Sequence, residues 1–312
     1  MKTPGDIVKG ILKRNGHGRG ATAEFAPALF IVGVPRSGTT LLRLMCDAHP
    51  ELSIPPEMGF IPALADLRRG RGDELREAFL NSVTGMATWQ DANIERAEFA
   101  QALGEVKPFT VSEGVRAFYS LYAARFGKSR WGDKTPAYCL HMDLIEKLLP
   151  EARFVHIIRD GRDVALSLRG LWFSPGDRVE ELANLWRSWI ITARRLGRRR
   201  RHYLEVRYED LIEQTPAVLR RVCDFIELSY DSQMERYYES APKRLDEVNS
   251  MYRSDGTLLI TKAERLYNQR FTAKPPERAR VARWRNEMDA GTRAGFAGVA
   301  GDLLEELGYA HG

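Results

Sequence analysis

The sequence has few cysteines and no long apolar run. Its three cysteines, Cys46, Cys139 and Cys223, are odd in number and far apart, and no two of them form a CxxC pair. They argue against a disulfide framework and predict small buried side chains in a reducing compartment. No apolar run approaches the roughly 20 residues of a membrane-spanning helix, and the N-terminal residues lack the apolar core of a signal peptide. We therefore expect a cytoplasmic protein with no membrane span.

The net charge of the sequence is also small. The 47 Lys and Arg residues outnumber the 42 Asp and Glu residues, which leaves a formal net charge of +5. This charge suits a protein that binds a small, highly charged anion, and it is too small to indicate a nucleic-acid partner. We expect residues 1–24, which are glycine-rich and basic, to form a loosely held arm. Residues 25–312 are expected to form one α/β domain with a helical insertion, in preference to two closely joined domains.

The segment 29–48 has the pattern of a strand, a tight loop and a helix. An apolar run at 29–32 breaks at Gly33, and the helical spacing of apolar residues resumes at Leu41. A loop that opens a helix in this way directs backbone N–H groups and the positive end of the helix dipole at one point. The segment therefore predicts a binding site for a phosphate or sulfate group.

Side chains of this loop also favour an anion. Ser37, Thr39 and Thr40 supply hydroxyl groups, Arg36 supplies a cation, and Gly38 lets the backbone come close to a ligand. The alternative is an ordinary glycine-containing turn between a strand and a helix. We favour the anion site because hydroxyls, glycine and arginine rarely cluster so tightly without an anion to hold.

The loop has Walker A spacing without the Walker lysine. Gly33 and Gly38 are correctly spaced, but Thr39 stands where the motif requires lysine, and the cation is Arg36 on the loop itself. This disfavours a P-loop kinase or NTPase. A small-molecule kinase that requires Mg²⁺ and ATP remains one alternative, and a non-catalytic anion-binding module is another.

Three further segments, 131–134, 154–158 and 203–208, predict strands, and each is followed by a helical pattern. Strands that alternate with helices are typical of a parallel sheet covered on both faces. Residues 59–128 carry helical patterns alone, so we expect a helical insertion that forms the acceptor side of the site. The predicted fold class is α/β: a P-loop-like three-layer fold with a central, mostly parallel sheet flanked by helices.

Two residues near the loop are candidates for chemistry. The extended path that Ile54-Pro55-Pro56 imposes returns Glu57 to the mouth of the loop, where it is a candidate general base. A solvated acidic residue in a proline-rich loop is the alternative. Lys134 ends a strand and is placed to face a ligand in the crevice of an open α/β sheet. The alternative for Lys134 is a surface lysine paired with Asp133.

A second cationic position follows the strand 154–158. Arg159 at the strand end and Ser167, two turns into the next helix, are placed to clamp a second phosphate. Asp160 imitates a Walker B carboxylate, but the arginines on either side would neutralise a metal-binding group. We interpret His156, inside the strand, as a core histidine with satisfied hydrogen bonds.

Two stretches resemble the nucleotide-binding motifs of sulfotransferases that use 3′-phosphoadenosine 5′-phosphosulfate (PAPS). PRSGTTLLRLMCDAHPELSIPPE is similar to their 5′-phosphosulfate loop, in the form found in the tyrosylprotein and bacterial carbohydrate-type branch. FVHIIRDGRDVALSL is similar to their 3′-phosphate motif. The order and spacing of GDKTP, of YEDL and of a late Lys-Pro followed by Trp-Arg agree as well. The resemblance covers most of the chain from 29 to 308 and leaves the helical insertion unmatched.

The resemblance implies a sulfotransferase that uses PAPS as its sulfuryl donor and requires no metal. It implies that the 5′-phosphosulfate is held by Arg36, Ser37, Gly38, Thr39 and Thr40. It also implies that the 3′-phosphate is held by Arg159, Ser167 and a late-loop cation, for which we choose Lys274. Tyr208, which begins the YEDL element, is expected at the cofactor too.

The resemblance further implies in-line sulfuryl transfer in which Glu57 is the general base. Arg36 and Lys134 would then neutralise the charge that grows on the bridging oxygen. We expect the acceptor to be a hydroxyl group of a small molecule, a sugar or a natural product. The sequence leaves the oligomeric state open, and a homodimer is one alternative.

Overall fold

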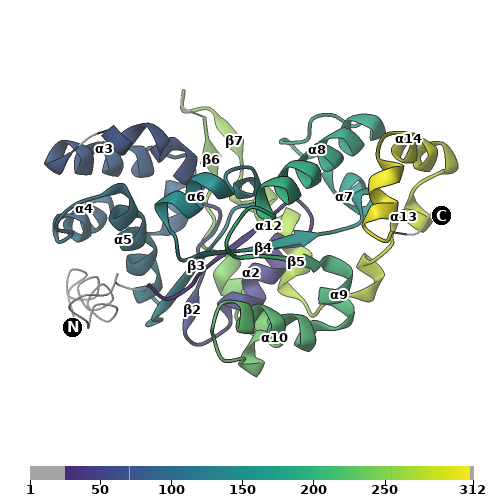
Figure 1. The fold of residues 1–312 in the computed structure, drawn as a ribbon. Coiled ribbons are helices and arrows are strands. Elements are labelled where there is room, and N and C mark those ends of the chain that lie inside the picture. Colours follow the sequence, from purple (N-terminus) through teal and green to yellow (C-terminus); the bar gives the residue numbers. More distant parts are fainter. Residues whose placement is uncertain (1–24, 70, 254, 310–312) are drawn as a thin grey trace.

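The computed structural model describes residues 25–69, 71–253 and 255–309 (Figure 1), so the arm predicted at residues 1–24 lies outside the described residues. At the centre is a five-stranded sheet with the strand order β2-β3-β1-β4-β5, and every neighbouring pair is parallel. The strands are β1 (Ala28–Gly33), β2 (Leu52–Ser53), β3 (Arg130–Lys134), β4 (Ala152–Ile158) and β5 (Tyr203–Arg207). The sequence does not predict the edge strand β2, which is only two residues long.

Side chains of β1 alternate between two apolar cores. Leu29 and Ile31 pack in the core that contains α2 and α10, and Phe30 and Val32 pack in the core that contains α5 and α6. The bounds of these helices are α2 (Thr39–Asp47), α5 (Val111–Ala124), α6 (Met142–Leu148) and α10 (Thr215–Phe225). Because helices cover both faces, all four β1 side chains are fully buried. The predicted three-layer α/β fold is confirmed.

The register of the sheet gathers the candidate residues at one edge. Ile31 of β1 pairs with Lys134 of β3, and Gly33 pairs with Ile157 of β4. A Cβ at Gly33 would lie 2.5 Å from the carbonyl oxygen of Ile157, so glycine is required where β1 passes into the loop. Parallel strands end on the same side of a sheet. The loop after β1, the end of β3 and Arg159 after β4 therefore emerge together.

The segment 59–128 is helical, as predicted. It contains η1 (Ile61–Arg69), α3 (Gly72–Thr84), η2 (Trp89–Ala92), α4 (Arg96–Gly104) and α5. Its aromatic rings pack on one another; those of Phe99 and Phe118, for example, meet edge to face with centroids 5.6 Å apart. These side chains belong to the core that also holds Phe30 and Val32 of β1, and Thr88 is the one described residue of the insertion that lines the cavity discussed below. We expected the insertion to form the acceptor side of the site, but the other residues that line the cavity belong to other segments of the chain.

A third apolar core packs two helices that follow β4 against the last two helices of the described chain. It surrounds the buried side chain of Trp186 and is built from α7 (Gly161–Leu168), α8 (Val179–Gly197), α13 (Trp284–Glu287) and α14 (Ala290–Glu306). The remaining helices are η3 (Pro136–Leu140), α9 (Tyr208–Glu213), η4 (Ser232–Met234), η5 (Tyr237–Glu239), α11 (Ala241–Leu245), η6 (Arg270–Ala273) and η7 (Arg278–Arg280).

An antiparallel hairpin and a polar helix were not predicted from the sequence. The hairpin consists of β6 (Met251–Tyr252) and β7 (Leu258–Ile260), and it projects from the body of the molecule (Figure 1). It leads directly into α12 (Lys262–Gln269), which has no buried residue and is started by a capping box between Thr261 and Glu264. Among the described helices, none combines the length and the apolar character needed to cross a membrane.

Candidate functional site

A cavity of about 390 Å³ lies at the carboxyl edge of the central sheet. Nine of the residues predicted from the sequence line it: Arg36, Gly38, Thr39, Thr40, Glu57, Lys134, Arg159, Ser167 and Tyr208. Ser37 and Lys274 are the two predicted residues that do not line the cavity. The structure therefore brings together residues from the loop after β1, the segment after β2, the end of β3, the position after β4, the last turn of α7 and the start of α9.

The loop after β1 opens α2 through a left-handed Gly38, which has a φ of 100°. A Cβ at this position would overlap the ring of Tyr208, so the loop and α9 are in direct contact there. No side chain caps the N-terminus of α2. The N–H groups of its first turn therefore remain available to an anion, and the helix dipole favours one.

Ser37 is placed inside this loop and away from the cavity wall. Its backbone N–H donates to the carbonyl oxygen of Val34 over 3.1 Å, which closes the turn. Its side chain is fully buried, and the hydroxyl has no hydrogen-bond partner among the described residues. The prediction that Ser37 contacts the anion stays a prediction.

Arg36 projects across the cavity from a strained backbone position, with a φ of 72°. Its Nε donates to the hydroxyl of Ser167 over 3.1 Å, and its Nη2 donates to the carbonyl oxygen of Asn268 over 3.0 Å. Burial, together with the nearby charges of Arg159 and Arg280, lowers the pKa of Arg36 to about 10, against the opposing effect of Glu57. The cavity thus concentrates positive charge that the neighbouring carboxylates do not balance.

Lys134 and Glu57 form an ion pair in the cavity. The Lys134 ammonium group also donates to the hydroxyl of Thr40 over 3.2 Å. The Lys134 side chain is 2% exposed and that of Glu57 is 46% exposed. Burial lowers the pKa of Lys134, and the charge of Glu57 opposes this effect. The arrangement excludes a surface lysine at 134 and places Glu57 on the solvent side of the pair.

Asp133, the other partner considered for Lys134, is bonded elsewhere. The hydroxyl of Tyr119 donates to its Oδ2 over 2.8 Å, and its side chain is fully buried. Burial raises the pKa of Asp133 to about 7, although the hydrogen bond from Tyr119 acts in the opposite direction. Lys134 is therefore held by Glu57 and Thr40.

Arg159 supports a second cationic position close to Arg36. Its guanidinium lies 4.2 Å from the centre of the Tyr208 ring and donates to the backbone carbonyl of Arg280 over 2.6 Å. It also pairs with Asp163 at 3.3 Å, whereas its buried Nε has no partner among the described residues. This unpaired donor, on a residue that lines the cavity, suits an anionic ligand.

The late cation that lines the cavity is Arg280, and Lys274 is exposed and outside it. The backbone of Lys274 instead accepts a hydrogen bond from Tyr237. Sequence reasoning missed Arg280. The signal that could have found it is the density of arginines between 278 and 285, four residues in eight positions.

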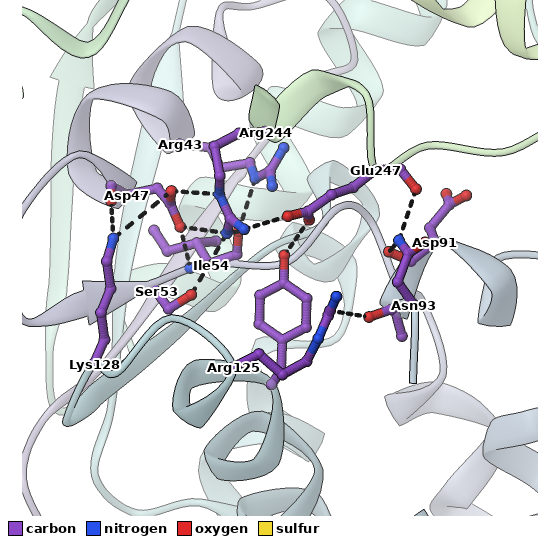
Figure 2. Close-up of polar contacts among 12 residues, drawn as sticks. Arg43, Asp47, Ser53, Ile54, Asp91, Asn93, Arg125, Lys128, Arg244 and Glu247 are labelled. Atoms are coloured by element: carbon purple, nitrogen blue, oxygen red, sulfur yellow. Dashed lines mark hydrogen bonds and ion pairs between the residues drawn. The ribbon is translucent and has the colours of Figure 1, made fainter. Parts of the chain in front are cut away.

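A buried polar network fixes the position of the segment that carries Glu57 (Figure 2). At the end of α2, Asp47 accepts from the backbone N–H of Ile54 over 2.7 Å, and Arg43 donates to the carbonyl oxygen of Ile54 over 2.9 Å. Arg244 of α11 binds both carboxylate oxygens of Asp47. Burial alone would raise the pKa of Asp47, but Arg244 and Lys128 outweigh it and lower the pKa. The segment from Ile54 to Glu57 is thereby tied to α2, the helix that the candidate anion loop opens.

Two residues that the sequence analysis set aside have structural roles. Asp160 caps the N-terminus of α7 and pairs with Arg162 at 2.7 Å, so its carboxylate is already engaged. His156 is fully buried, with its Nδ1 2.6 Å from the hydroxyl oxygen of Tyr203. The carboxylate of Asp160 is therefore neutralised, as interpreted, and the core position of His156 is confirmed. The expectation of satisfied hydrogen bonds is wrong, because the Nε2 of His156 has no hydrogen-bond partner among the described residues. Within residues 25–69, 71–253 and 255–309, no group of three or more His, Cys, Asp or Glu residues is arranged to hold a metal ion.

The fold and the cavity define a P-loop-like α/β protein whose loop after β1 is a candidate anion site, with Thr39 at the position of the Walker lysine and Arg36 as the cation of the loop. The family model described as the sulfotransferase family matches residues 27–232. The chain therefore belongs to the sulfotransferase family, whose members are transferases.

Similar proteins include the nodulation protein NoeE of Sinorhizobium fredii, which is 28% identical over 303 residues, covering 90% of this chain and 65% of that protein. The chain thus spans less than two thirds of that relative. A putative protein-tyrosine sulfotransferase of Caenorhabditis briggsae is 27% identical over 231 residues, covering 72% of this chain and 74% of that protein. In fold, the chain is similar to the sulfotransferase domain of the olefin synthase from Synechococcus PCC 7002. The TM-score is 0.56 at 24% identity, over 96% of this chain and 98% of that one.

Proposed function

We propose that the chain transfers a sulfuryl group from PAPS to a hydroxyl group of an acceptor, and that Glu57 is the general base. The observation that carries the proposal is the chain of contacts from Glu57 through Lys134 to Thr40 at the start of α2. It joins a half-exposed carboxylate to a buried ammonium group and to the anion-binding helix in one cavity. A hydroxyl that reached Glu57 would stand beside the cationic groups of the site.

The residues present fit PAPS at two separate anionic groups. The uncapped N-terminus of α2, Arg36 and Lys134 suit the 5′-phosphosulfate. Arg159, with its unpaired Nε, together with Ser167 and Arg280 suits the 3′-phosphate. We propose Arg280 as the late-loop cation in place of Lys274, because Arg280 lines the cavity next to Arg159.

Bound in this way, PAPS supplies a sulfuryl group whose bond to the 5′-phosphate oxygen breaks, leaving the electron pair on that oxygen, as the acceptor oxygen bonds to sulfur. Glu57 accepts the hydroxyl proton, which requires hydrogen-bond contact with the acceptor oxygen. Arg36 and Lys134 stabilise the negative charge on the phosphate by position and electrostatics. The proposed reaction needs no metal ion, because cations of the chain carry this charge.

The three cysteines are free and buried, which supports the predicted reducing, cytoplasmic setting. Thr39 at the Walker lysine position and the pairing of Asp160 with Arg162 count against a kinase, which would need a phosphate-binding lysine and a carboxylate for Mg²⁺.

Calorimetric titration of the purified protein with 3′-phosphoadenosine 5′-phosphate (PAP), AMP, and ATP with Mg²⁺ tests the donor. We expect PAP to bind more tightly than AMP, because AMP lacks the 3′-phosphate that Arg159 and Arg280 would hold. PAP affinity should be the same with Mg²⁺ and with EDTA. A preference for ATP with Mg²⁺, or equal affinity for PAP and AMP, would contradict the proposal.

A further inference from the structure

Exposed apolar side chains gather around the mouth of the cavity. Among the described residues, the large hydrophobic side chains that are exposed are Trp172, Phe173, Ile191, Tyr252, Leu258 and Tyr267. All except Ile191 lie on segments that line the cavity: the connection between α7 and α8, the β6–β7 hairpin, and α12. Water-exposed aromatic and aliphatic groups concentrated at one opening indicate a binding surface.

Trp172 and Phe173 are the centre of this surface. Their rings meet edge to face, with centroids 5.4 Å apart, and both side chains line the cavity. They nevertheless remain 49% and 39% exposed. Two adjacent aromatic rings that pack on each other form a rigid apolar platform.

A second part of the cavity lining is also apolar. Val248, Met251 and Ile260 line the cavity from the hairpin and the residues before it. Arg265, which lines the same wall, is engaged by Asp91 at 2.6 Å. Its charge is therefore balanced, unlike the charge of Arg36, whose guanidinium donates to the hydroxyl of Ser167 and the carbonyl oxygen of Asn268. The floor thus suits an anionic donor, and the mouth suits an uncharged apolar group.

We propose that the acceptor is amphipathic, with its hydroxyl group attached to an extended alkyl or aromatic body that binds between Trp172–Phe173 and the wall of Met251 and Ile260. This inference rests on the proposed function, because an acceptor must share the cavity with Glu57. A wholly polar acceptor, such as an unmodified oligosaccharide, would meet apolar side chains that offer it no hydrogen bonds.

The test uses methyl, butyl, hexyl and octyl β-D-glucopyranoside, kept monomeric, as probes titrated into the PAP-saturated protein. Each probe presents the same sugar hydroxyls, so the series isolates the apolar body. We expect affinity to rise by up to about fourfold per added CH₂ group, the factor that burial of a methylene group gives. Transfer of ³⁵S from labelled PAPS to the octyl probe should exceed transfer to the methyl probe in the same order.

The variant for this test is Trp172→Ala/Phe173→Ala, which should abolish the dependence on chain length and leave PAP affinity within about twofold. Ile191→Ala is the matched control, since Ile191 is 45% exposed on α8 and does not line the cavity. It should retain the full chain-length dependence. Because all three side chains are exposed, these changes leave the buried cores intact.

Three results would overturn the inference. The first is equal affinity for the methyl and octyl probes in the wild-type protein. The second is a chain-length dependence that survives in the double variant or is lost equally in Ile191→Ala. The third is binding to phosphatidylcholine vesicles that the double variant loses, which would assign the surface to a membrane. Failure of PAP to bind would instead contradict the proposed function. The inference about the acceptor would then fail as well, whether or not the alkyl glucosides bind.

Discussion

The guanidinium group of Arg244 and the carboxylate of Asp47 face each other through two contacts of 2.7 Å, although 197 residues separate them in the chain. Asp47 ends the helix that begins at the anion loop, and the same carboxylate holds the backbone of Ile54. Glu57 follows three residues later. The ion pair therefore connects the position of the candidate base to that of the anion site.

Asp47→Ala should lower the free energy of unfolding by about 3 kcal/mol, the lower end for breaking a buried ion pair, because the buried Arg244 loses Asp47 and keeps Glu247 as a carboxylate partner. The pair is almost fully buried, with side chains 6% and 3% exposed. Urea unfolding followed by circular dichroism measures the change. Asp302→Ala is the matched control, since the ion pair of Asp302 with Arg187 lies at the surface and its loss should not change stability measurably. Equal stability of the two variants would contradict the role of Asp47.

Local patterns were sufficient to predict the parts of the site that lie close together in the sequence. The loop from Gly33 to Thr40 could be predicted because apolar periodicity switches at that point from strand to helix. Lys134 and Arg159 could be predicted because Lys134 ends a short strand, Arg159 directly follows an apolar one, and parallel strands end on one side of a sheet.

Contacts between distant segments could not be predicted in the same way. The contact between Arg159 and Arg280 spans 121 residues, and no local periodicity distinguishes Arg280 from its neighbouring arginines. Lys274 was chosen because it precedes proline, a local feature that does not determine where its side chain points. The β6–β7 hairpin escaped prediction because its strands are short and α12, which follows it, buries no side chain.

Glu57→Gln should reduce sulfuryl transfer by about 10²–10⁴-fold, the usual contribution of a general base, and Glu57→Ala should abolish it. PAP affinity should stay nearly unchanged, because the proposed phosphate ligands are untouched. Transfer from labelled PAPS to octyl glucoside and calorimetric titration with PAP separate the two effects. Glu277→Gln is the control, because Glu277 lines the same cavity without contacting Lys134 or Thr40. Near-normal turnover of Glu57→Gln would remove Glu57 from the role of base.

Arg280→Ala should weaken PAP binding by about 10- to 100-fold, since a hydrogen bond to a charged group contributes about 1.5–3 kcal/mol. AMP, which lacks the 3′-phosphate, should bind the variant and the wild type alike. Lys274→Ala removes a cation from the same part of the chain without altering the cavity wall, and it should leave both affinities unchanged. The reverse result, loss in Lys274→Ala and none in Arg280→Ala, would restore the prediction made from the sequence.

The buried ring of His156 should make the free energy of unfolding fall as the pH is lowered below 6.5. Burial lowers the pKa of its ring to about 4, against an ordinary value of 6.5, so the folded state keeps the ring neutral while the unfolded state binds a proton. Its contribution is complete above pH 6.5 and is lost as the pH falls from 6.5 toward 4, a difference of about 3 kcal/mol. His156→Gln should flatten that part of the curve of unfolding free energy against pH. Identical slopes for the two proteins would contradict the assignment.

Gly38→Ala tests whether the contact between the anion loop and Tyr208 is needed for donor binding. The new methyl group would overlap the Tyr208 ring, which is 6% exposed and packs against the guanidinium group of Arg159. We therefore expect the loop to shift away from α9 and PAP affinity to fall by about 100-fold, comparable to the loss of one strong charged hydrogen bond.

The positive φ of Gly38 adds backbone strain to the effect of the overlap with Tyr208. A variant at Gly127 separates these two effects. Gly127 also has a positive φ, 67°, but a Cβ there would have no neighbour within 4 Å. Gly127→Ala should cost only the left-handed strain of about 1–2 kcal/mol and leave PAP binding unchanged. A larger loss of stability in Gly38→Ala, together with its loss of PAP affinity, would be the effect of the overlap with Tyr208. Equal losses of stability and normal PAP binding in both variants would mean that the loop tolerates the methyl group and that glycine serves there only for its backbone angle.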